Sequence, residues 1–92
     1  MGGMTTMTYD DDVKKRLRRV EGQVRGVLKM MEAEKECRDV VHQLSAIRSA
    51  VDKTMAYIVA VNLQQRILQE RDRGMDTGPL VREAVELLIK SR

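Results

Sequence analysis

The chain has 92 residues, with 17 Lys or Arg against 14 Asp or Glu and a net charge of +3, and this length predicts one small domain. Its single cysteine excludes an intramolecular disulfide, and no apolar run approaches the roughly 18 residues that a membrane span needs. The first residues show no signal-peptide pattern and a lone thiol suits a reducing compartment, so we expect a cytoplasmic protein without a membrane partner.

Residues 1–10 show no helical pattern, so we expect a disordered N-terminal segment followed by a single helical domain over residues 11–92. From Val13 to Met31 the apolar residues recur at spacings of three and four, which predicts a helix over residues 11–33. The acidic residues at 10–12 favour its start, because the helix dipole stabilises negative charge there.

A second helix is predicted to begin at residues 36–39 and to reach Asp72, with Gly74 as its stop. A helix of that length is roughly 50 Å long, which is too long for one short chain to cover. Its apolar stripe therefore implies a partner subunit and a four-helix bundle made by two chains.

A third helix is predicted over residues 79–90, with Asp76 or Thr77 as its cap and Pro79 in its first turn. Its apolar face is wide for so short a helix, so we expect it to lie at an oligomer contact. The fold class predicted from the three segments is all-α.

Basic residues gather between Lys14 and Lys29, where one acid, Glu21, interrupts them. This local density favours a polyanion partner. The only aromatic residues are Tyr9 and Tyr57, which disfavours base stacking on single strands and favours contact with duplex phosphates. The alternative interpretation is a solvated basic face on a bundle helix.

Two glycines, Gly22 and Gly26, lie four residues apart on one side of the same predicted helix. Each costs about 1 kcal/mol of helix propensity relative to alanine. This cost predicts the close approach of another backbone.

Cys37 is the candidate for reactive chemistry. The start of a helix and the neighbouring Lys35 and Arg38 favour its thiolate, whereas flanking glutamates disfavour it. The alternative is a structural thiol on the apolar seam. His42 lies on another face of the helix, so we interpret it as a surface residue and expect no closed zinc site from one chain.

Asn62 and Arg66 interrupt the apolar seam of the second helix with two polar side chains four residues apart. Either the bundle ends there and both positions are wet, or they form a pocket wall facing a cysteine of another subunit. The sequence contains no Ser-His-Asp set, paired-carboxylate motif or phosphate loop, so we expect no enzyme activity, thiol transfer at Cys37 being the nearest alternative.

Residues 16–26 (RLRRVEGQVRG) and 37–53 (CRDVVHQLSAIRSAVDK) resemble the CsoR/RcnR family of bacterial repressors. Residues 83–91 are similar to the ends of its persulfide-sensing, CstR-like branch. The resemblance covers most of residues 13–92 and implies three helices per chain, an antiparallel four-helix-bundle dimer and a disc-like tetramer. It also implies operator binding through basic faces, which by position would use Lys15, Arg16, Arg18, Arg19, Arg25 and Arg48.

Copper sensors of that family use a cysteine together with a histidine and a second cysteine from the partner subunit. By the resemblance, Cys37 matches the first cysteine, while Asn62 and Arg66 occupy the other two positions. Copper(I) prefers thiolate and imidazole ligands, so we expect no resident cofactor and keep copper only as an alternative. The persulfide branch shares the asparagine but pairs two cysteines, and formaldehyde sensors use an N-terminal proline that the first residues of this chain do not contain.

We therefore predict a homo-oligomeric repressor of double-stranded operator DNA that is derepressed when reactive sulfur, an oxidant or an electrophile reacts with Cys37. Asn62 and Arg66 would complete the sensor site. The alternatives are a divergent copper-sensing repressor and, in another class, a helical oligomerisation module without DNA binding.

Overall fold

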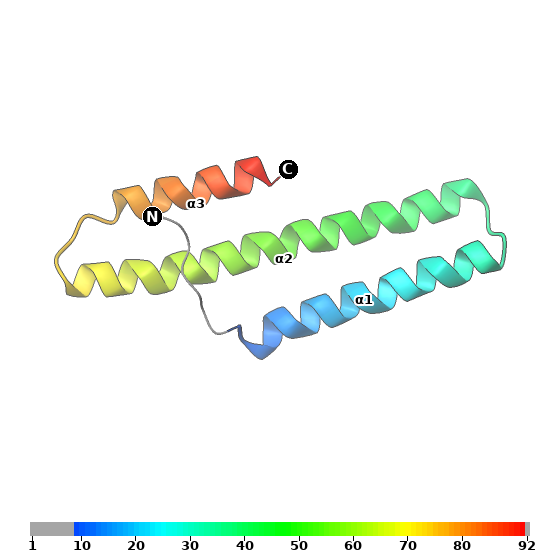
Figure 1. Ribbon diagram of the computed structural model, residues 1–92, viewed down its shortest axis with the longest axis horizontal. Helices are drawn as coiled ribbons and strands as arrows, with labels where there is room; N and C mark the ends of the chain where they lie inside the picture. The colour runs from blue at the N-terminus through cyan, green and yellow to red at the C-terminus, as the bar shows by residue number, and fades with distance from the viewer. Residues whose placement is uncertain (1–8, 92) are drawn as a thin grey trace. The chain divides into compact units, whose positions relative to one another are not determined.

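The computed structural model describes residues 9–91, which form helices α1 (Asp11–Glu32), α2 (Cys37–Asp72) and α3 (Gly78–Lys90) (Figure 1). The all-α class is confirmed, and each helix begins and ends within one residue of the expected bounds. Most of the predicted disordered segment lies outside the described residues. Within the described part, no helix is both long and apolar enough to cross a bilayer.

The chain divides into two compact units, and the boundary between them falls inside α2. The N-terminal unit contains residues 9–54, so it pairs α1 with the first half of α2 in an antiparallel hairpin (Figure 1). The C-terminal unit, residues 55–91 of the described chain, pairs the second half of α2 with α3.

The start of α1 is fixed by Asp10, whose carboxylate accepts a hydrogen bond from the Val13 backbone N–H at 2.9 Å. This bond satisfies one of the backbone donors that a helix leaves unpaired at its first turn. At α3, Thr77 occupies the cap position but makes no side-chain capping bond. Asp76 instead accepts from the Gly78 N–H at 2.9 Å, so the acid is the one of the two predicted caps that bonds the backbone.

Helices α1 and α2 end in the same hydrogen-bonded turn. At the end of α1, the Lys35 N–H donates to the Met30 carbonyl at 3.0 Å, and Glu34 adopts a φ of 56°. At the end of α2, the equivalent residue is Gly74, with a φ of 74°. Glycine adopts this left-handed conformation without steric cost, so the predicted stop at Gly74 is confirmed, whereas Glu34 shows that the same turn forms without glycine.

The N-terminal unit buries Val13, Val27 and Thr54, and leaves much of its apolar surface in contact with solvent. Four apolar side chains spaced along α1 are between 43% and 54% exposed: Leu17, Val24, Leu28 and Met31. Their spacings of seven, four and three place them on one side of the helix, so α1 carries a continuous uncovered apolar stripe.

Candidate nucleic-acid interface and sensor residues

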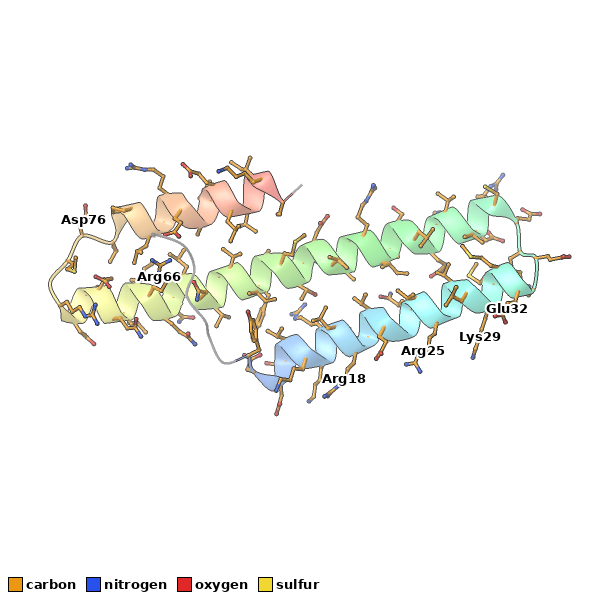
Figure 2. All side chains as sticks on the ribbon, viewed as in Figure 1. Arg18, Arg25, Lys29, Glu32, Arg66 and Asp76 are labelled. Atoms are coloured by element: carbon orange, nitrogen blue, oxygen red, sulfur yellow. The ribbon has the colours of Figure 1, made fainter. Side chains whose placement is uncertain are left out.

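Helix α1 carries a row of cations on its outer side. Arg18, Arg25 and Lys29 are exposed and project away from the α2 segment of the same unit (Figure 2). Their spacings of seven and four place them on one helical face, which we call the outer basic stripe. The predicted close approach of another backbone at Gly22 and Gly26 does not occur within the described chain, because a Cβ built at either glycine would meet no atom within 4 Å.

A second cationic surface lies between α1 and α2 inside the N-terminal unit. A hollow of about 420 Å³ is lined by Arg16, Arg19 and Gln23 from α1 and by Ala46, Ser49, Ala50, Lys53 and Thr54 from α2. We call it the cationic groove, because three of its lining side chains are positive and none is acidic. Such a surface suits the oxyanions of a phosphate backbone.

The six residues predicted to contact DNA are all exposed, and the structure distributes them over different surfaces. Arg18 and Arg25 belong to the outer basic stripe, whereas Arg16 and Arg19 line the cationic groove. Arg48 lies on α2 beside a smaller hollow that Val41, Leu44 and Ser45 also line, and Lys15 is exposed on α1.

Lys53 is not among the six residues predicted to contact DNA. Its only sequence signal was its place at the end of the segment 37–53. The pairing of α1 with α2 brings it into the same groove as Arg16 and Arg19.

Cys37 is the first residue of α2, and its thiol is exposed. His42 is exposed as well, as expected for a surface residue. Within residues 9–91, no group of three or more His, Cys, Asp or Glu side chains is placed to hold a metal ion. What the described chain offers at this end of α2 is therefore a solvent-accessible thiol.

Asn62 and Arg66 lie in the C-terminal unit, one turn apart on α2. Asn62 is only 4% exposed, so the interpretation that this position is wet does not hold for it. The Arg66 guanidinium donates from Nη1 to Oε2 of Glu83 on α3 at 3.2 Å, and the two side chains are 18% and 28% exposed. The ion pair joins the two helices of the unit, and no sequence pattern predicts Glu83 as the partner of Arg66.

The three predicted sensor residues lie in different units, Cys37 in the N-terminal unit and Asn62 and Arg66 in the C-terminal unit. Cys37 begins α2, and Asn62 lies 25 residues further along the same helix, which corresponds to about seven turns. Asn62 and Arg66, one turn apart on α2, are neighbours by helical spacing.

Comparison with known proteins extends over nearly the whole described chain. The family model for the metal-sensitive transcriptional repressor matches residues 9–90. The protein YrkD of Bacillus subtilis, itself uncharacterized, is 51% identical over 63 residues, which make up 68% of this chain and 100% of YrkD. The copper-sensing transcriptional repressor RicR of Mycobacterium tuberculosis is 53% identical over 53 residues, which make up 58% of this chain and 50% of RicR.

Two solved structures are similar in fold. The nickel-responsive transcriptional regulator InrS superimposes with a TM-score of 0.73 and 25% identity, over 96% of this chain and 98% of InrS. The copper-sensing repressor CsoR with Cu(I) from Geobacillus thermodenitrificans superimposes with a TM-score of 0.72 and 27% identity, over 98% of this chain and 97% of that one.

Proposed function

Because the chain belongs to the family of metal-sensitive transcriptional repressors, we propose that it represses transcription by binding operator DNA. We propose further that a reaction at Cys37 releases it from the operator. The supporting observation is the ion pair between Arg66 and Glu83. By the resemblance, Arg66 stands where copper sensors place their second cysteine. A guanidinium in that position cannot bind a metal ion, since it has no lone pair to donate.

The residues of this chain do not fit the copper ligand set of the family. Copper(I) prefers thiolate and imidazole, but only Cys37 of the three positions supplies one of them. Asn62 supplies an amide, and Arg66 adds a positive charge that is already held by Glu83. The proposed release therefore depends on the sulfur of Cys37 and not on a bound metal ion.

Chemistry at the sulfur of Cys37 needs no further ligand, and the thiol is exposed to solvent-borne reagents. With an inorganic polysulfide such as tetrasulfide, the Cys37 thiolate attacks a terminal sulfur and forms a new S–S bond. The S–S bond to the rest of the reagent breaks, and trisulfide leaves with its electron pair. The cysteine sulfur is oxidised to a persulfide, the polysulfide is reduced, and the total charge is unchanged.

A persulfide at the start of α2 can release DNA only if it stabilises a state of the oligomer that binds DNA less tightly. In the proposed oligomer, Arg66 and Asn62 of one subunit lie near Cys37 of another. The cationic Arg66 would then stabilise the anionic persulfide, in competition with Glu83. This competition links the modified sulfur to the contact between α2 and α3.

The test uses the full chain and a duplex from the region upstream of its own gene. We expect tight binding that tetrasulfide weakens and Cu(I) leaves unchanged. The Cys37→Ser variant should bind with the affinity of the unmodified chain and no longer respond, because the hydroxyl keeps the shape but not the nucleophile. Tetrasulfide release that persists in Cys37→Ser would contradict the proposal.

A divergent metal sensor is the second candidate, and the similarity to the copper-sensing RicR and to the nickel-responsive InrS favours it. In this case Cys37 would act with ligands from another subunit. Release of the duplex by Cu(I) or Ni(II) at one ion per chain, and none by tetrasulfide, would support this candidate over the first.

A further inference from the structure

The cationic groove contains a polar atom whose hydrogen-bonding capacity is unused. The side-chain oxygen Oε1 of Gln23 is buried, and it has no hydrogen-bond partner among the residues that the structure describes. A buried acceptor without a partner lowers stability, because it has lost its bonds to water and gained none in return. Such a group calls for a physical explanation.

Two cationic side chains line the same groove as this acceptor. Arg19 precedes Gln23 by four residues on α1, so their side chains are neighbours on the helix surface, and Lys53 lines the same groove from α2. Within residues 9–91, neither Arg19 nor Lys53 takes part in an ion pair. The groove thus combines two cations that lack a counter-ion with an acceptor that lacks a donor.

We propose that Gln23 is a positioning residue for phosphate recognition, an inference that rests on the proposed DNA-binding function. When a DNA phosphate enters the groove and displaces water, the Arg19 guanidinium bonds the phosphate with one edge and donates another N–H to Gln23 Oε1. The guanidinium has five N–H donors in a rigid plane, so it can bond both partners at once. The unsatisfied oxygen of the free protein is satisfied in the complex.

The test replaces Gln23 with methionine, which has a similar shape and no strong acceptor. The free protein should become more stable, with a melting temperature a few degrees higher, because the unsatisfied oxygen is gone. DNA affinity should fall about tenfold, because Arg19 loses its orienting bond. A residue with only a packing role would not change stability and affinity in opposite directions. Gln43→Met, at an exposed glutamine of α2 outside the groove, is the matched control and should change neither quantity.

A double variant tests whether Gln23 acts on DNA affinity through Arg19. Arg19→Ala should reduce the dependence of log Kd on log salt by about one ion, as expected for one lost phosphate contact. In the Arg19→Ala background, Gln23→Met should have no further effect on affinity. The inference would be overturned if Gln23→Met bound DNA with unchanged affinity. It would also be overturned if Gln23→Met reduced DNA affinity as much in the Arg19→Ala background as in the unmodified chain. Failure of the unmodified chain to bind any duplex would overturn the proposed function, and the inference with it.

Discussion

Arg66 is the residue that most changes the interpretation of the sensor site. Its ion pair with Glu83 is half-buried, whereas Arg73, in the turn that follows α2, pairs with Glu70 and stays mostly exposed. Partial burial strengthens the first pair, because less solvent screens it. Arg66 therefore has a structural partner within its own subunit, and any role at Cys37 requires it to exchange one anion for another.

Restoring the family's copper ligands should restore copper binding. We expect the double variant Asn62→His and Arg66→Cys to bind Cu(I) tightly at one ion per chain, because thiolate and imidazole then join Cys37 in the oligomer. Competition with a coloured Cu(I) chelator under anaerobic conditions measures this affinity. Asn62→His alone is the control and should bind no better than the unmodified chain. Equal Cu(I) affinity of the unmodified chain and the double variant would show that these positions do not decide the metal response.

At the scale of the helices, α1 and α2 end in the same turn, so introducing a glycine at the end of α1 should stabilise the fold, and removing the glycine at the end of α2 should destabilise it. Glu34 has a φ of 56°, which costs a residue with a Cβ roughly 1 kcal/mol, so Glu34→Gly should stabilise the fold by up to that amount. Gly74 has a φ of 74°, so Gly74→Ala should destabilise it by about 1 kcal/mol. Urea unfolding of the two variants measures both free energies. A stabilising Gly74→Ala would contradict this account of the helix end, since no neighbouring atom obstructs the added methyl group.

At the scale of the whole molecule, we expect the neighbouring residues Leu28 and Lys29 on α1 to contact different partners, another subunit and DNA. Leu28 is 54% exposed in the apolar stripe, whereas Lys29 belongs to the outer basic stripe. We expect Leu28→Glu to dissociate the oligomer, because a charge in an apolar interface is left without a partner. Lys29→Glu should keep the oligomer and weaken DNA binding, with a smaller dependence on salt.

Sedimentation velocity and duplex titration of both variants separate these effects. Leu28→Glu should also lose DNA affinity if the operator is bound by more than one subunit. An unmodified chain that sediments as a monomer at micromolar concentration would contradict the expected role of the apolar stripe.

The sequence by itself determined the helices and the family. The spacing of three and four between apolar residues from Val13 to Met31 matches the period of an α-helix, which depends only on the backbone of that segment. Gly74 likewise marks a position where the backbone adopts a positive φ, which glycine favours. The repressor class follows from motifs that the family model also matches. The stop at Glu34 carried no such signal, because a glutamate is not a typical residue for a left-handed turn.

The tertiary structure decided which residues of different helices meet. The pairing of Arg66 with Glu83 spans 17 residues and depends on how α3 packs on α2, which no local period encodes. The groove shared by Arg16, Arg19 and Lys53, and the buried oxygen of Gln23, likewise exist only once α1 lies along α2. Helical spacing depends on the backbone of one segment, so the sequence indicated which residues share a face of a helix. Contacts between helices depend on how the two helices pack, so the sequence did not indicate which residues of another helix each face contacts.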